Sequence, residues 1–192
     1  MRIISGEARG RRIAAPRGMQ TRPTSDLMRG VIFSMLASMG VHPSSVLDLY
    51  AGTGALGIEA LSRGAESVAF VERDRSACAV IRANLLRTGY AERAHVFCLP
   101  VERFLTRRSG PYTVVFADPP YADPAIVAVL GSLAKTPAVD PMTTLVYEHS
   151  RRTEPPPVVG RLGLRQTRTH GDSSVSFYRY TQPATVDEEA RA

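Results

Sequence analysis

The sequence VLDLYAGTGALGIEAL at residues 46–61 contains the pattern from which the architecture follows. The apolar run at 46–50 predicts a short buried strand, AGTG at 51–54 predicts a tight turn, and residues 55–63 predict a helix. Because glycine has no Cβ, such a turn lets backbone N–H groups and the positive helix N-terminus approach a small polar ligand. We therefore expect an α/β protein with a ligand site at this turn.

The glycine spacing leaves the identity of that ligand open. Gly52, Gly54 and Gly57 satisfy the G-x-G-x-x-G fingerprint, so a nicotinamide or flavin site of an oxidoreductase is one interpretation. Asp48 gives further information about the ligand, because a carboxylate in an apolar strand needs a hydrogen-bonding partner such as a ligand's ammonium group or hydroxyl. The choice between ligands depends on residues further along the chain.

A second motif follows the strand predicted at 112–117, where the chain reads Asp118-Pro119-Pro120-Tyr121. Together, DLYAGTG at 48–54 and DPPY at 118–121 resemble the class I S-adenosylmethionine-dependent methyltransferases, in the branch that methylates exocyclic amino nitrogens of nucleobases. The dinucleotide interpretation leaves DPPY unexplained, because nothing downstream supplies a hydride-transfer site.

The DPPY residues suit an amino nitrogen whose lone pair is delocalised into a base ring. The Asp118 carboxylate and the Pro119 carbonyl can accept both N–H bonds and direct the lone pair at the methyl group. Pro119 and Pro120 stiffen the turn, and Tyr121 offers a ring on which a base can stack. Adenine N6, cytosine N4 and guanine N2 each present two N–H groups, so DPPY does not identify the base.

The rest of the chain alternates predicted strands and helices. Strands are expected at 67–71, 95–98, 112–117 and 144–149, helices at 26–39, 75–88, around 104 and at 124–133, and a closing strand pair at 161–169 and 173–181. This order predicts a Rossmann-like methyltransferase fold with a mostly parallel, seven-stranded sheet and a reversed terminal strand. We expect a methyltransferase domain at 25–182, a basic N-terminal extension at 1–24 and a disordered tail at 183–192.

The expected cofactor is S-adenosylmethionine, held at the carboxyl ends of the first three predicted strands. Glu72 ends the second strand, 24 positions after Asp48, where an acidic residue can accept hydrogen bonds from ribose hydroxyls. The resemblance implies that Pro100 and Val101 line the adenine. The predicted cofactor contacts are Asp48, Tyr50, Ala51, Gly52, Thr53, Gly54, Glu72, Arg73, Pro100 and Val101.

Positive charge is concentrated at the start of the chain. Residues 1–30 hold seven arginines and two acidic residues, a net charge of +5 out of the formal +6. This segregation predicts that the extension, with a short basic hairpin at 3–15, meets a polyanion. Removal of residues 1–20 is expected to abolish RNA modification and to spare cofactor binding. The predicted RNA contacts are Arg9, Arg11, Arg12, Arg22 and Arg29.

A closer resemblance covers essentially the whole chain. ISGEARGR at 4–11, P-x-G at 16–18, RPT-x-D-x-x-R at 22–29 and F-x-x-L at 33–36 are similar to the bacterial 16S rRNA guanine-N2 methyltransferases. Leu27 and Gly30 depart from that pattern, which usually has arginine and glutamate there. The resemblance implies methylation of a guanine N2 in 16S rRNA, within the small ribosomal subunit or its assembly intermediate. A DNA or RNA adenine-N6 methyltransferase is the alternative, and a non-enzymatic RNA-binding module is a third reading.

The remaining composition bears on the cellular setting. No apolar run approaches the length of a membrane span, and residues 1–12 lack the apolar core of a secretory signal. Cys78 and Cys98 show neither CxxC nor paired-histidine spacing, so we expect free thiols and no metal. We expect a cytoplasmic monomer without membrane contact.

Overall fold

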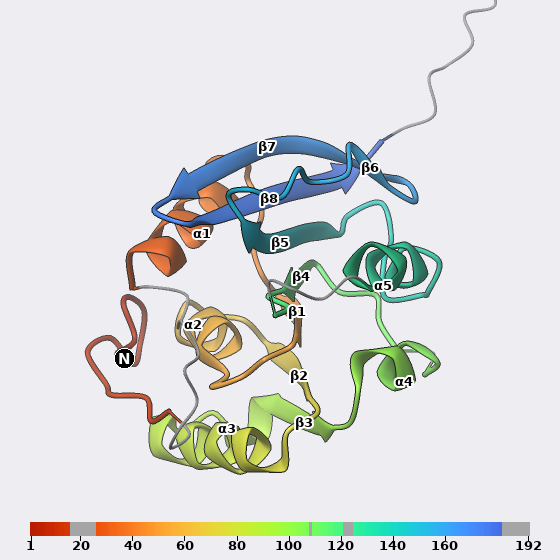
Figure 1. Cartoon of the computed structure of the whole chain (residues 1–192). Coiled ribbons are helices and arrows are strands. Elements are labelled where there is room, and N and C mark those ends of the chain that lie inside the picture. Colours follow the sequence, from red (N-terminus) through yellow and green to blue (C-terminus); the bar gives the residue numbers. More distant parts are fainter. Residues whose placement is uncertain (16–25, 108, 121–124, 182–192) are drawn as a thin grey trace, which may run out of the picture.

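The computed structural model describes residues 1–15, 26–107, 109–120 and 125–181. Figure 1 shows one sheet with helices on both of its faces. The strands are β1 (Ser45–Leu49), β2 (Ser67–Glu72), β3 (Ala94–Cys98), β4 (Val114–Ala117), β5 (Thr144–Ser150), β6 (Val158–Val159), β7 (Leu162–His170) and β8 (Ser173–Tyr180). The helices are α1 (Asp26–Ser38), α2 (Ala55–Ser62), α3 (Arg75–Thr88), α4 (Val101–Leu105) and α5 (Ile126–Leu133), with a 3-10 turn, η1 (Ala91–Arg93).

The strand order is β3-β2-β1-β4-β5-β8-β7-β6. β1 pairs in parallel with β2 and β4, and the parallel set continues to β3 and β5. β8 runs antiparallel to both of its neighbours, which confirms the mostly parallel α/β sheet with a reversed strand. The described chain has eight strands rather than seven, because the two residues of β6 pair with Leu162 and Gly163 of β7.

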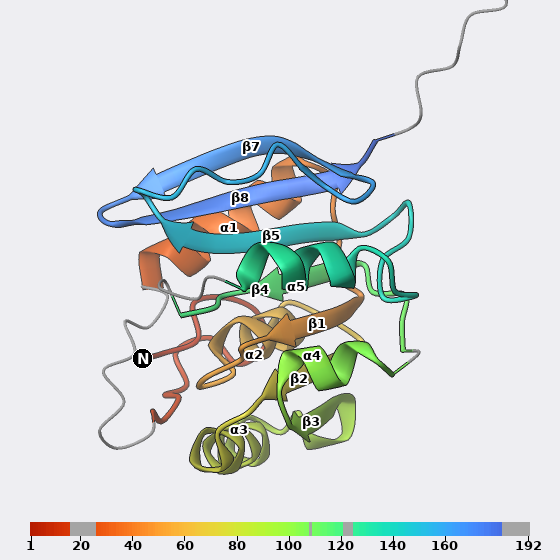
Figure 2. The same ribbon diagram turned by 45° about the vertical axis from the view of Figure 1, so that its right-hand side comes forward.

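The core is divided by the sheet into two layers. Alternate side chains of a strand point to opposite faces, so Val46 of β1 packs with α1, α2 and α3, whereas Leu47 packs with α4 and α5. Figure 2 shows α4 and α5 in front of the sheet and α1 and α2 behind it. All four residues of β4 are buried, as expected for a central strand of a parallel sheet.

One glycine sets how closely α2 approaches the sheet. A Cβ on Gly57 would lie 2.3 Å from Cε1 of Phe70 in β2 and 2.9 Å from a Val68 methyl group. The absence of a side chain at Gly57 therefore lets α2 pack directly on β2. This contact assigns a packing role to the third glycine of the G-x-G-x-x-G spacing.

The N-terminal segment, which we define as residues 1–14, folds back on itself, as expected for the short basic hairpin predicted at 3–15. Ile3 N donates to Arg11 O at 3.0 Å and Gly10 N donates to Ile3 O at 2.9 Å, beside an antiparallel bridge between Arg2 and Arg12. Three apolar residues of the segment belong to the same core cluster as α1, α2 and α3, namely Ile3, Ala8 and Ile13. These three side chains therefore attach the segment to the core.

Among the described residues, no helix combines the length and apolar character that a membrane crossing requires.

Candidate functional site

The carboxyl ends of the parallel strands β1, β2 and β4 meet at one edge of the sheet. Leu49 of β1 is paired with Val71 of β2 on one side and with Ala117 of β4 on the other. The glycine turn, Glu72 and Asp118 directly follow these paired residues, and neighbouring strands lie about 4.8 Å apart. The strand order reverses between β1 and β4, and open α/β sheets bind their ligands at such a switch point.

The turn after β1 has an open side and a packed side. Tyr50 has φ 59°, a left-handed conformation that is uncommon outside glycine. A Cβ on Gly52, at φ 54°, would meet only Tyr50 O, at 3.9 Å, among the described residues. A Cβ on Gly54 would contact Ile81 and Phe70 at 3.3 Å. Gly52 therefore leaves space for a ligand, and the lack of a side chain at Gly54 lets the turn pack closely against Ile81 and Phe70.

Glu72 is bonded directly to this turn. Its Oε2 accepts from Gly52 N at 2.9 Å and its Oε1 accepts from Asp74 N at 2.8 Å. The residue is 8% exposed, and a carboxylate can accept about four hydrogen bonds, which is two more than these amides use. The structure thus places the acidic residue beside Gly52, with acceptor capacity for a ligand hydroxyl.

Asp48 is buried in β1, and its Oδ2 accepts a hydrogen bond from Gly57 N at 3.0 Å. Desolvation, opposed by this hydrogen bond and reinforced by the charge of Glu72, raises the pKa of Asp48 to about 8. The sequence analysis expected a ligand ammonium group or hydroxyl as the partner of this carboxylate, whereas the structure supplies a backbone amide in the first turn of α2. Asp48 therefore connects β1 to α2, and its burial favours the protonated form of the carboxyl group.

The DPP residues leave β4 beside the glycine turn. Asp118 N donates to Leu49 O at 3.5 Å, so the end of β4 stays attached to β1. Asp118 is half-buried, Pro119 is buried and Pro120 is exposed. Tyr121 lies outside the described residues.

The other predicted cofactor residues surround the same edge. Ala51 N donates to Val71 O at 3.1 Å, which holds the start of the turn against β2. Thr53 is buried at the turn, and Arg73 is exposed just after β2. Pro100 caps α4 and is exposed, and the next residue, Val101, is buried. Each contact of these residues with a cofactor stays a prediction.

The predicted RNA-binding arginines separate into three groups. Arg9, Arg11 and Arg12 are exposed on the N-terminal segment, and Arg11 Nη1 donates to Arg87 O and Thr88 O, both at 3.2 Å. Arg29 needs correction, because its side chain is fully buried in α1 and donates from Nη2 to Arg2 O at 2.6 Å and to Asp26 Oδ1 at 2.8 Å. Its burial makes it a structural residue rather than an RNA contact. Arg22 lies outside the described residues.

A shallow hollow of about 500 Å³ lies against the segment and is lined by Met1, Arg2, Gly10, Arg12 and Asp26. Arg2 Nε lies 3.6 Å from Asp26 Oδ2, and the two side chains are 73% and 47% exposed. Met1 Sδ is 3.9 Å from Thr53 Oγ1, so the hollow adjoins the glycine turn. Figure 2 shows the N-terminus on the side toward which the arrowheads of β1 and β5 point.

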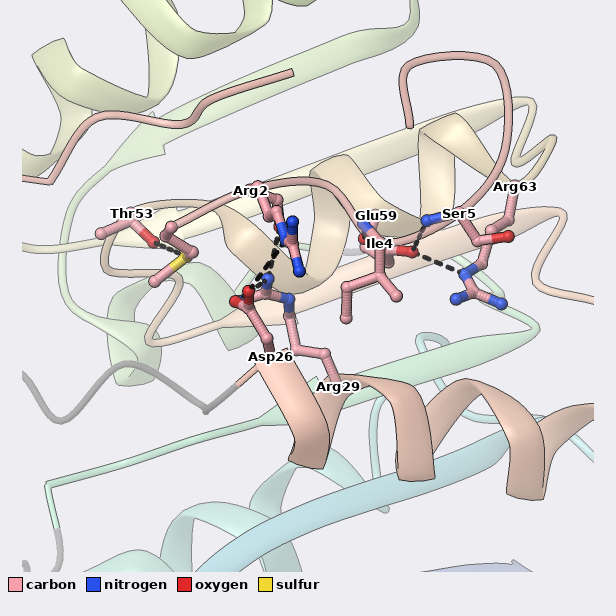
Figure 3. A network of polar contacts seen from close by, with 9 residues as sticks. Arg2, Ile4, Ser5, Asp26, Arg29, Thr53, Glu59 and Arg63 are labelled. Carbon is pink, nitrogen blue, oxygen red and sulfur yellow. Dashed lines mark hydrogen bonds and ion pairs between the residues drawn. The ribbon is translucent and has the colours of Figure 1, made fainter. Parts of the chain in front are cut away.

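Two buried polar residues that hold the segment were missed in the sequence. Glu59 of α2 accepts from Ile4 N at 2.8 Å, from Ser5 N at 3.0 Å and from Arg63 Nε at 2.8 Å (Figure 3). Asn84 of α3 bonds to the segment and to the turn. The sequence pattern could have identified them, because each is a polar residue at a core-facing position of an otherwise apolar helix face.

Comparisons with known proteins agree with this geometry. The model of the family described as conserved hypothetical protein 95 matches residues 1–179. Ribosomal RNA small subunit methyltransferase D of Haemophilus influenzae is 30% identical over 182 residues, which cover 93% of each chain. The Escherichia coli protein of the same name is 40% identical over 121 residues, 63% of this chain and 60% of that one.

Solved structures give the same result. The structure of yhhF from Escherichia coli is 31% identical, with a TM-score of 0.82, and the match covers 94% of this chain and 97% of that chain. A hypothetical protein from Thermus thermophilus is 30% identical, with a TM-score of 0.78 and coverage of 93% and 99%. These matches extend over nearly the whole chain.

Proposed function

The chain belongs to the rRNA methyltransferase family whose model is described as conserved hypothetical protein 95, and on that basis we propose that it transfers a methyl group from S-adenosylmethionine to the exocyclic N2 of a guanine in 16S rRNA. The relatives named ribosomal RNA small subunit methyltransferase D support the substrate class. The guanine N2 assignment rests on the sequence resemblance. The observation that carries the proposal is the meeting of Gly52, Glu72 and Asp118 at one edge of the sheet.

The residues at this edge fit S-adenosylmethionine. The open side of Gly52 can receive a ligand that a Cβ would obstruct. Glu72 lies beside that opening with free acceptor capacity for ribose hydroxyls. Val101, at the start of α4, supplies a buried apolar side chain near the end of β3 for the adenine. When bound, the cofactor supplies a methyl group that is already activated on a sulfonium.

The remaining chemistry is alignment of the nucleophile by Asp118 and Pro119. The carboxylate and the carbonyl accept the two N–H bonds of the amino group, so its lone pair is directed toward the methyl group. The bound cofactor would supply the methyl group and leave as S-adenosylhomocysteine, and the amino nitrogen would pass one proton to the Asp118 carboxylate that accepts its N–H bond. Pro119 and Pro120 have restricted φ angles, so the acceptor carbonyl is held in place before the reaction.

RNA positioning falls to the exposed arginines of the N-terminal segment. Arg2, Arg9 and Arg12 lie on the exposed surface of the segment, which adjoins the site through Met1 and Thr53. Contacts to phosphates set position and orientation without reading the sequence. A folded small subunit or its assembly intermediate presents such phosphates in a fixed arrangement, which favours it as the partner.

The test is transfer of labelled methyl from S-adenosylmethionine to small ribosomal subunits isolated from cells that lack this protein, followed by nucleoside analysis. We expect N2-methylguanosine at one site in 16S rRNA. Asp118→Ala should lower the transfer rate by orders of magnitude and leave S-adenosylhomocysteine affinity within about threefold. Label in N6-methyladenine, or label that appears only with DNA, would overturn the proposed substrate. A near-normal rate for the variant would overturn the role of Asp118.

A further inference from the structure

Both ends of the N-terminal segment meet at Thr53 in the glycine turn. Met1 Sδ lies 3.9 Å from Thr53 Oγ1 at one end, and Figure 3 shows this contact beside the bonds that Arg2, Ile4 and Ser5 make. At the other end, Ala14 is joined to Thr53 through Asn84. Ile13 N donates to Met1 O at 3.0 Å and so ties the two ends to each other. The segment is thus a closed loop with both ends at the turn.

Asn84 makes the connection with a single planar amide. Its Oδ1 accepts from Ala14 N at 2.9 Å, and its Nδ2 donates to Ala14 O at 3.0 Å and to Thr53 O at 3.1 Å. The residue is fully buried, so water cannot replace a broken bond without opening the core. Because the two donors and the acceptor are rigidly linked, a shift of Ala14 relative to Thr53 breaks at least one of these bonds.

The same segment also carries side chains that face solvent. Arg2, Arg9 and Arg12 are exposed, and Arg2 and Arg12 line the hollow described above; Arg11 is exposed too, but its Nη1 donates to carbonyls at the end of α3. A polyanion that binds these arginines therefore holds the segment from outside, while Asn84 holds it from inside. Through Asn84 the segment is bonded to Thr53, which lies between Gly52 and Gly54.

We propose that the N-terminal segment couples the two substrates: RNA bound to its arginines and cofactor bound at the glycine turn tighten each other's binding, with Asn84 as the positioning residue. This inference rests on the proposed function, since it takes RNA as the polyanion. When the first ligand binds, it orders the segment and, through Asn84, the turn. The second ligand then has a smaller loss of conformational entropy on binding, so it binds more tightly. The same factor must apply in both directions.

The first experiment measures this factor. The dissociation constant of S-adenosylhomocysteine, which cannot react, is determined with and without small ribosomal subunits. We expect at least about fivefold tighter binding with the subunits, and the same factor for subunit binding with and without S-adenosylhomocysteine. Asn84→Ala should bring the factor close to one.

Ser62→Ala is the matched control. Ser62 is also buried, and its Oγ accepts from Ala8 N at 3.0 Å and donates to Ser5 O at 2.6 Å. Both bonds hold the segment without reaching the turn. The control variant should therefore be less stable than the wild type and still show the full coupling factor. Equal loss of coupling in both variants would overturn the role of Asn84.

A second measurement needs no variant. Asn84 is the only asparagine in the sequence, so protein labelled with 15N-asparagine has one side-chain amide pair in its NMR spectrum. S-adenosylhomocysteine should shift this pair and slow its hydrogen exchange, and subunits should slow the exchange further. An unchanged signal with a coupling factor of one would overturn the proposal.

The two proposals fail in different ways. If subunits do not bind while S-adenosylhomocysteine still changes the Asn84 signal, the RNA substrate is wrong and the link between segment and turn stands. If subunits are methylated normally while the wild-type coupling factor is one, the substrate stands and the coupling is wrong.

Discussion

Glu59→Ala should strongly destabilise the protein without touching the proposed catalytic residues. The carboxylate is fully buried and accepts three hydrogen bonds, from the amides of Ile4 and Ser5 and from the Arg63 guanidinium. Removal leaves two half-buried amides and a guanidinium whose side chain is 27% exposed without their acceptor. Because Glu59 itself is fully buried, the expected cost is at the level of a broken buried charge pair, about 3–5 kcal/mol. For a chain of this size, such a loss corresponds to a fall in Tm of roughly 6–20 °C.

The unfolding free energy is measured by urea unfolding with circular dichroism as the signal, and Tm is measured by thermal melting. Glu59→Gln should lower the unfolding free energy by less, about 1–3 kcal/mol, because glutamine keeps one acceptor oxygen but places its NH2 group next to a donor. Glu66→Ala is the control, since Glu66 is exposed, and its unfolding free energy should stay within about 0.5 kcal/mol of the wild type. A loss below about 1 kcal/mol in Glu59→Ala would show that the segment is not held by this carboxylate.

Three further outcomes follow from the structure. Asp48→Asn should make the unfolding free energy less dependent on pH. The pKa of Asp48 rises from 3.8 to about 8 on folding, so the wild-type unfolding free energy should fall by up to about 1.4 kcal/mol per pH unit between pH 4 and 8. Urea unfolding at pH 5, 6 and 7 would measure this slope in both proteins. Gly57→Ala should cost about 1–3 kcal/mol, because its Cβ would overlap Phe70, seen as a lower urea midpoint. Deletion of residues 1–14 should weaken S-adenosylhomocysteine binding in calorimetry as well as RNA methylation, because Glu59 and Asn84 lose their partners.

This last outcome replaces the expectation that truncation spares cofactor binding. The sequence showed the charge of the segment, which is a property of its composition. It did not show that Ile3 and Ile13 pack in the core, because the few apolar residues of the segment follow no clear period. Arg29 was wrongly predicted to contact RNA. Its charge can be counted from the sequence, whereas its burial depends on a hydrogen bond to the Arg2 carbonyl, 27 residues away in the chain.

Elements with local signals were predicted most closely. The expected helix at 75–88 is confirmed as α3, which starts after the Asp74 cap, where the side chain accepts from Ala77 N, and ends at Gly89 with φ 81°. Capping and glycine chemistry act within a few residues, so they can be read directly from the sequence. β6 was missed because two residues carry no periodic pattern, and its pairing with β7 is a tertiary contact. The DPP residues were placed correctly because strand ends of a parallel sheet share one edge.

The order of the strands explains why three distant segments converge at one turn. β1 occupies the centre of the parallel set, with β2 on one side and β4 on the other, so the residues after β1 are the only ones in this set that border both Glu72 and Asp118. The N-terminal segment reaches the same turn from outside the sheet, through Thr53. Cofactor, target base and RNA backbone would each be held by a different segment. The glycine turn contacts Glu72 and the N-terminal segment, and it follows Leu49, whose carbonyl accepts from Asp118 N. A change in the segment should therefore alter the KM values of both substrates together, whereas a change at Asp118 should act mainly on kcat.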